Sequence, residues 1–170
     1  MNELDMDAQE EKRPVFLTVL AVLSLVNIGW SFMTNMFSYL RGPMSEDQME
    51  QYKADLSRSF IDLDNGGEGM QMLVDMKNNI MHMVEALNAN HTMNVLSTCL
   101  VLILGAVGVV MMLRRRKLGF HLYILYSFFA STQLYLFVAP SFIINAVVIL
   151  SLVLSGIFIL LYAQNLKWMK

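Results

Sequence analysis

The longest uncharged stretch of the chain decides its fold. Residues 118–166 read LGFHLYILYSFFASTQLYLFVAPSFIINAVVILSLVLSGIFILLYAQNL and contain no Asp, Glu, Lys or Arg. A helix needs about 20 apolar residues to cross the hydrocarbon core of a bilayer, so this stretch has room for two crossings. Pro140 lies near its middle, and proline ends a helix because it lacks the amide proton. We therefore expect spans at 118–139 and 140–163, joined by a tight turn at Pro140.

Two other stretches are equally free of charge, one between Arg13 and Arg41 and one between Glu85 and Arg114. Each has room for one further crossing, and we place these spans at residues 14–40 and 92–113. The stretches are continuously apolar, whereas barrel strands would alternate between polar and apolar residues. A helix also satisfies its own backbone hydrogen bonds inside lipid. The sequence therefore predicts an all-α, polytopic membrane protein with a four-transmembrane-helix bundle.

The composition excludes several other classes of protein. Of the 170 residues 56% are hydrophobic and 15% are charged, against about 25% charged in a typical soluble domain. The net charge of -2 lacks the basic excess of a nucleic-acid-binding protein. The single cysteine, Cys99, excludes a scaffold held by intrachain disulfides. We expect no nucleic-acid partner.

The positive charges predict the orientation of the chain in the membrane. Lys and Arg near the ends of spans favour the cytoplasmic side. Eight of the 12 lie in the tail 1–13, the turn 114–117 and the tail 164–170, which four spans place on one side. The other four lie in segment 41–91 with nine acidic residues, so this segment has a net charge of -5. We expect both termini in the cytoplasm and segment 41–91 outside it.

The turn 114–117 is the most basic part of the chain. We interpret it as an anchor that fixes the topology, and binding of anionic lipid headgroups is the alternative. Its four residues are Arg114, Arg115, Arg116 and Lys117.

The external segment 41–91 has the pattern of a helical hairpin. Ser45 followed by acidic residues is a typical helix start, and apolar residues recur at steps of three and four as far as Leu63. Asp64-Asn65-Gly66-Gly67 predicts a break, and a second helix runs from Glu68 towards the membrane with a heptad seam. A continuous helix from Gly69 to Leu113 would be about 67 Å long. The residues at which it could bend are Asn88, Asn90 and Asn94.

No motif of catalysis is present in the sequence. There is no HExxH pair, no nucleophile elbow and no phosphate-binding glycine loop. We therefore expect no enzyme and no bound cofactor, and interpret the chain as a membrane subunit or scaffold surrounded by lipid. Its acidic, Met-rich loop would bind another membrane or periplasmic protein, or a second copy in a homo-oligomer. The predicted contact residues share the apolar faces of the two external helices: Met49, Tyr52, Leu56, Leu73, Met76, Ile80, Met83 and Leu87.

Two alternative functions remain open. Polar side chains in the predicted spans, namely Asn27, Asn35, Gln133 and Asn145, would line the pathway of a small oligomeric transporter or channel. Such transporters usually keep an ionisable residue within the membrane, and the one candidate, His121, lies beside the basic turn. The Met and His residues of the loop would suit copper, although methionine on an apolar seam favours packing.

A short stretch carries a resemblance to a known group of proteins. Arg116-Lys117-Leu118-Gly119-Phe120-His121-Leu122-Tyr123 resembles a basic-Gly-aromatic-Tyr pattern in small, uncharacterised four-span bacterial proteins of Bacteroidota type, over about ten residues. The resemblance implies four spans and a bacterial inner membrane, and it implies no activity. The plan of one large first loop and a short second loop is similar to claudin-type and tetraspanin-type proteins. The loop cysteines of those families are absent, so this likeness concerns topology alone.

Overall fold

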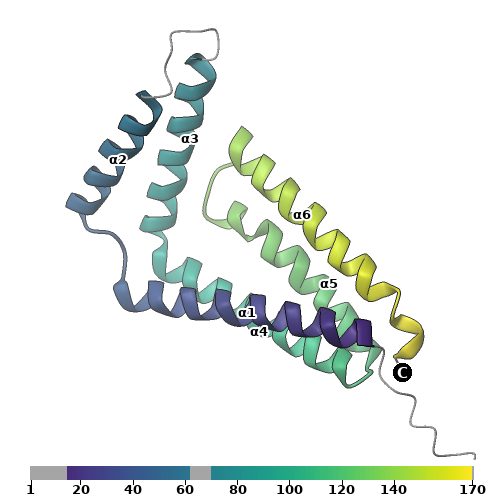
Figure 1. Ribbon diagram of the computed structural model, residues 1–170. Coiled ribbons are helices and arrows are strands. Elements are labelled where there is room, and N and C mark those ends of the chain that lie inside the picture. Colours follow the sequence, from purple (N-terminus) through teal and green to yellow (C-terminus); the bar gives the residue numbers. More distant parts are fainter. Residues whose placement is uncertain (1–14, 62–69, 170) are drawn as a thin grey trace, which may run out of the picture.

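The computed structural model describes residues 15–61 and 70–169, and every regular element in these two ranges is helical. The expected all-α class is confirmed over this part of the chain. Two short 3₁₀ helices, η2 (Gln133–Leu136) and η3 (Leu166–Trp168), follow α5 and α6. The α-helices labelled in Figure 1 are α1 (Val15–Arg41), α2 (Glu46–Ile61), α3 (Met70–Ala89), α4 (His91–Leu113), α5 (Lys117–Thr132) and α6 (Phe142–Ala163). The tail 1–13 and the predicted break at Asp64-Asn65-Gly66-Gly67 lie outside the described residues.

Three helices of the described chain, α1, α4 and α6, are long and apolar enough to cross a membrane. Their bounds lie close to the predicted spans 14–40, 92–113 and 140–163. The predicted span 118–139 is different, because α5 ends at Thr132 and the chain continues as η2. We expected four long transmembrane helices, and the described ranges contain three that are long and apolar enough.

The end of η2 before Pro140 has a local cause. Pro140 has no amide proton, so the carbonyl group of Leu136 has no helical donor four residues later. The amides of Phe137 and Val138 both donate to the carbonyl oxygen of Leu134, at 3.2 and 3.0 Å, and such tightening is common in the last turn of a helix. Beyond Pro140, the Ser141 hydroxyl accepts a hydrogen bond from the third residue of α6 and caps that helix.

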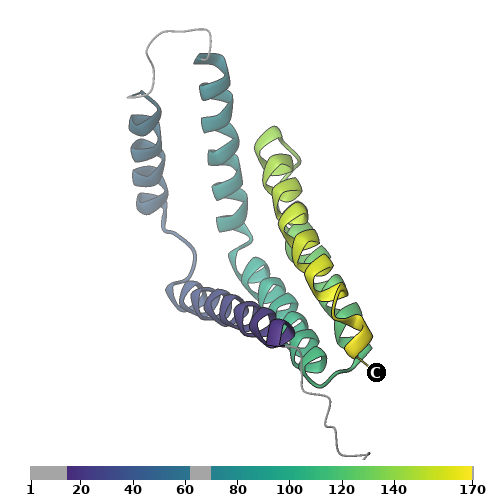
Figure 2. The same cartoon turned by 45° about the vertical axis from the view of Figure 1, so that its right-hand side comes forward.

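The apolar helices form two antiparallel pairs. Figures 1 and 2 show α1 beside α4 and α5 beside α6, and the two pairs meet near the C-terminus and diverge towards the other end. The most extensive contacts are those of α4 with α5 and with α1, followed by those of α5 with α6. The main buried core lies where the pairs meet, and its buried residues are Leu17, Leu20, Ala21, Ile28, Leu102, Val109, Met112, Phe120, Tyr123, Tyr162 and Met169.

The backbones of α4 and α5 approach each other directly at two glycines. A Cβ atom on Gly119 would lie 2.6 Å from the carbonyl oxygen of Gly108 and 2.6 Å from the amide nitrogen of Met112. A Cβ atom on Gly108 would lie 3.1 Å from the carbonyl oxygen of Gly119. Small residues permit this close approach between membrane helices, where van der Waals packing replaces the hydrophobic effect as the driving force.

The helices α2 and α3 form a hairpin that rises from the ends of α1 and α4 (Figure 1). The α1 helix ends at Gly42, which has a φ of 74° and donates to the carbonyl oxygen of Ser38 at 3.1 Å. The α2 helix begins with a capping box, in which Ser45 and Gln48 each bond the backbone amide of the other through their side chains. The predicted helix start at Ser45 thus has its expected hydrogen bonds.

The predicted continuous helix from the loop to Leu113 is bent at Asn90, so a straight rod of about 67 Å does not form. Asn90 has φ −105° and ψ 23° and separates α3 from α4. Its side-chain amide donates to the carbonyl oxygen of Ala86 at 2.9 Å, beside the backbone bond from the Asn90 amide to the same oxygen at 3.1 Å. Asn side chains that bond nearby backbone in this way compete with regular helix geometry.

The glycine contact can be tested by comparing two identical substitutions. Gly119→Ala places a methyl group against backbone atoms that cannot rotate away, so we expect a loss of about 1–3 kcal/mol in stability. The measurement is thermal unfolding of the protein in detergent, followed by circular dichroism. Gly156→Ala in α6 is the matched control, because nothing lies within 4 Å of its added methyl group. An unchanged Tm for Gly119→Ala would contradict the packing described here.

Candidate functional site

The eight residues predicted to contact a partner all lie on the hairpin helices. Met49, Tyr52 and Leu56 lie on α2, and the other five lie on α3. Tyr52 is exposed, and the other seven are half-buried. No side chain described in α2 or α3 is fully buried, so the hairpin has no closed core of its own within the described residues.

The lower part of α3 packs against the outer end of the α5–α6 pair. Met83 and Leu87 contact a small buried cluster made by Val138, Ile144 and Val148. These two seam residues therefore have partners within the chain. The upper seam residues of α3, which are Leu73, Met76 and Ile80, belong to neither buried cluster.

One ion pair joins the two hairpin helices. Lys53 Nζ of α2 contacts Glu85 Oε1 of α3, and it is the one salt bridge between these helices within the described residues. The hydrogen bond and the charge of Lys53 lower the pKa of Glu85 from its ordinary value of 4.5, and His82, with Nδ1 at 3.7 Å from Glu85 Oε2, adds a smaller effect in the same direction. The hairpin is thus held together at its surface by charge as well as by apolar contact.

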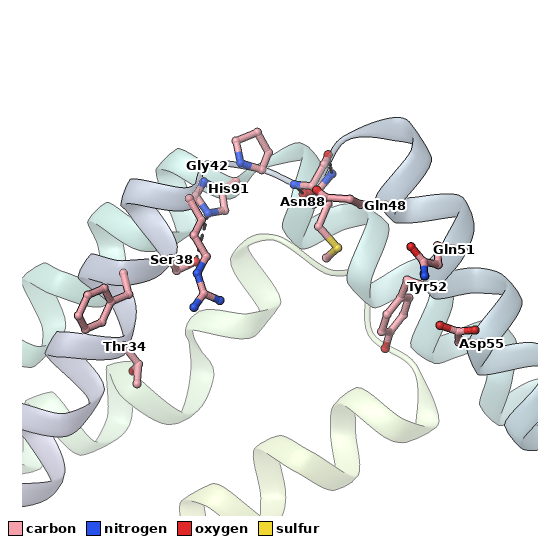
Figure 3. A pocket seen from close by; sticks show the side chains of 13 residues that line it. Thr34, Ser38, Gly42, Gln48, Gln51, Tyr52, Asp55, Asn88 and His91 are labelled. Carbon is pink, nitrogen blue, oxygen red and sulfur yellow. Dashed lines mark hydrogen bonds between the residues drawn. The ribbon is translucent and has the colours of Figure 1, made fainter.

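The base of the hairpin is clamped to α1 by side chains that flank the bend. The Asn88 side chain accepts a hydrogen bond from the Met44 amide at 2.7 Å and donates one to the Met44 carbonyl oxygen at 3.1 Å. Ser38 Oγ and His91 Nε2 lie 3.2 Å apart and join α1 to the start of α4. Figure 3 shows Ser38, Asn88 and His91 at an open cleft of about 850 Å³ between α1, α2 and the bend, and Arg41 is among the residues that line it.

The basic turn joins α4 to α5. Arg115 has a φ of 60°, in the left-handed region where glycine would be unstrained. Its amide donates to the carbonyl oxygen of Met112 at 2.9 Å, and the amide of Arg116 donates to that of Met111 at 3.0 Å, which are the two bonds of a Schellman motif. The chain therefore retains an arginine at a position that conformational preference would give to glycine.

The four polar residues predicted to line a pathway lie in four different places. The Asn35 amide donates to the Ser31 carbonyl oxygen in its own helix at 3.0 Å. Gln133 donates to Thr98 Oγ1 at 3.3 Å, and its own Oε1 is buried without a hydrogen-bond partner among the described residues. Asn145 accepts from the Tyr135 hydroxyl at 2.9 Å. Asn27 borders a cleft between α1, α5 and α6, and the structure does not bring the four together.

The sequence analysis did not predict the hydrogen bond that joins α1, the first helix of the chain, to α6, the last α-helix. The Tyr162 hydroxyl of α6 donates to Ser24 Oγ of α1 at 2.9 Å, and both residues are buried. The rings of Tyr162 and Tyr123 lie 4.7 Å apart between centroids. The two bonded residues are 138 positions apart, and the only sequence signal was that each is a polar residue within an apolar helix.

Metal-binding groups are dispersed over the hairpin. Within the described ranges no three His, Cys, Asp or Glu residues lie close enough to hold a metal ion. Of the methionines considered for copper, Met72 and Met93 are strongly exposed, and Met76 and Met83 are half-buried on the apolar seam. Comparison of the chain with family models, curated proteins and solved structures found no match.

The ion pair between α2 and α3 predicts a pH dependence of the hairpin. Because the pKa of Glu85 is lowered in the folded chain, the stabilisation by the pair is fully present above pH 4.5 and is lost as the pH falls through the folded-state pKa. Titration of the Glu85 carboxyl group by NMR should give a midpoint below 4.5, and Lys53→Met should raise it towards 4.5. The matched control is Arg58→Met, since Arg58 pairs with Asp55 within α2 at 3.6 Å. The same midpoint in Lys53→Met and in the parent protein would remove the ion pair as the cause.

Proposed function

We propose that the chain crosses the membrane four times, with α5 and η2 together forming the third crossing. Their combined length is about 32 Å at the usual rise per residue, close to the hydrocarbon thickness of about 30 Å. The stretch contains no charged residue beyond Lys117. It also lies beside α6, which is itself long enough to cross. A 3₁₀ helix rises more per residue than an α-helix, so α5 extended by η2 is long enough to cross the hydrocarbon core.

In this arrangement the protein spans a bacterial inner membrane, and both of its termini lie in the cytoplasm. The basic turn 114–117 and the basic C-terminal residues then share one side with the tail 1–13. The arginine kept at a left-handed backbone position supports a role of the turn as a topology anchor. The hairpin, with the net charge of -5 of segment 41–91, lies on the opposite side.

Cysteine labelling distinguishes four crossings from three. In a Cys99→Ala background, Ser59→Cys in α2 and Gln164→Cys after α6 place single thiols at exposed positions. With four crossings, a membrane-impermeant maleimide should label position 59 in intact spheroplasts and position 164 only after lysis. Labelling of both positions from outside would show that α5 does not cross the membrane.

The function that the geometry supports best is that of a non-enzymatic membrane subunit whose hairpin binds another protein. One observation carries this proposal: α2 and α3 are amphipathic, yet neither fully buries any described side chain. Covering an apolar protein surface that faces water lowers the free energy of the system. A partner protein, or a second copy of the chain, would supply the missing cover.

The upper seam of α3, Leu73, Met76 and Ile80, is the best candidate for the contact surface. Met83 and Leu87 below it already pack against the α5–α6 pair. Methionine adapts to irregular partner surfaces because its side chain is flexible and polarisable. The acidic residues around the seam favour a partner surface with basic residues at its rim.

Photocross-linking from matched positions tests this function. A photoreactive amino acid at Met76 should give one discrete adduct in native membranes, whereas the same group at the exposed polar position Asn78 should give none. An adduct of twice the chain mass of 19.4 kDa would show self-association, and any other mass a different partner. Ile80→Asp should reduce the adduct at least tenfold, because it introduces a charge into the apolar surface. Recovery of the uncross-linked chain alone from both positions would contradict the proposal.

A further inference from the structure

The backbones of α1 and α6 approach each other at few positions, and one polar contact joins the two helices. That contact is the hydrogen bond from Tyr162 to Ser24 described above. The α1 helix instead packs on α4, and α6 packs on α5. The space they leave is a cleft of about 430 Å³ lined by α1, α5 and α6. It lies within the apolar part of the molecule, since α1 and α6 are both long enough to cross a membrane.

Asn27 is a polar residue of this cleft whose side chain has no hydrogen bond within the described residues. It lies near the middle of α1, and its exposed side chain borders the cleft. Asn35, Gln133 and Asn145 each have a hydrogen bond within the chain, but the Asn27 amide has none within the described residues. An amide group in hydrocarbon is unfavourable unless it is hydrogen-bonded. A molecule with oxygen atoms in the cleft would satisfy it.

The lining of the cleft specifies the chemistry of such a molecule. The polar residues of the lining are Asn27 and residues with hydroxyl groups that include Tyr126, Ser127 and Ser155, the last of which is bonded to Ser131. No charged side chain is among the lining residues, and the remainder are apolar groups such as Leu154 and Phe158. A charged ligand would find no counter-charge there, so the lining favours an uncharged ligand. The volume is in the range of pockets that hold small molecules.

We propose that the cleft between α1, α5 and α6 binds an uncharged, lipid-soluble molecule through carbonyl oxygens that accept hydrogen bonds from Asn27 and Tyr126. The molecule enters sideways from the lipid between α1 and α6, because the backbones of these helices do not pack against each other along their length. Quinones and diacylglycerols both have this chemistry. The proposal rests on α1 and α6 lying in the bilayer and is independent of the partner of the hairpin.

Trp30 provides an intrinsic reporter for the cleft. It lies three residues after Asn27 on α1 and is 74% exposed. The only other tryptophan is Trp168, so Trp168→Phe gives a protein with a single fluorophore. The experiment titrates decyl-ubiquinone, which quenches tryptophan, into this protein in phosphatidylcholine nanodiscs. We expect a saturable quenching component above the linear collisional background.

Matched variants separate binding from collision. Asn27→Leu should weaken the saturable component at least tenfold, whereas Asn35→Leu, the same change two turns later on α1, should retain it. Tyr126→Phe removes only a hydroxyl group and should weaken binding roughly two- to tenfold, as expected for one hydrogen bond. Circular dichroism and the Tm of each variant show that it is folded.

Competition identifies the source of the carbonyl groups. Dioctanoylglycerol does not quench tryptophan, so displacement of the quinone by it would assign the site to ester carbonyls, and failure to displace would assign it to quinones. Superimposable quenching curves for the parent protein and Asn27→Leu would overturn the proposal. It would equally be overturned if Asn27→Leu converted a dimer to a monomer without changing the quenching, because Asn27 would then pair with a second copy.

Discussion

The close approach of α4 and α5 at Gly108 and Gly119 is the contact on which the remaining packing depends. The α4 helix also supports α1, and α5 also supports α6, so this interface is the most extensive connection between the two helix pairs, beside the hydrogen bond from Tyr162 to Ser24. In lipid, apolar side chains gain little by leaving their surroundings, and helices associate through close packing and hydrogen bonds. A Cβ atom on Gly119 would meet backbone atoms at 2.6 Å, so the contact requires a residue without a side chain there.

The ends of the apolar helices could be predicted well from the sequence because charged residues limit them. The bounds of α1 and α4 follow the charge-free stretches closely, and α6 begins just after Pro140. The end of α5 could not be predicted in this way, since no charge lies near it. Gln133, the first residue after α5, donates a hydrogen bond to Thr98 in α4. That contact exists only after α4 and α5 have packed together.

The candidate contact surface was predicted as one continuous seam, and the structure divides it. A heptad pattern shows which residues of a helix share a face, but it does not show what covers each part of that face. The bend at Asn90 sets the direction of α3 and brings Met83 and Leu87 onto the α5–α6 pair. Three asparagines near the membrane entry indicated a bend, but the pattern did not show which one would form it. The contact of Tyr162 with Ser24 was beyond sequence reasoning, because neither residue lies in a local motif.

The α6 helix connects the hairpin to the intramembrane cleft, because both the α3 helix and the cleft contact it. The α3 helix packs against the N-terminal part of α6, at Ile144 and Val148, whereas the cleft is bordered by its later residues Leu154, Ser155 and Phe158. The α6 helix buries few of its own residues, and its main packing is on α5. A shift of α6 in response to α3 would therefore also alter the border of the cleft. Binding at the hairpin and binding in the cleft would then influence each other to the same extent in both directions, as linkage requires of any two coupled sites.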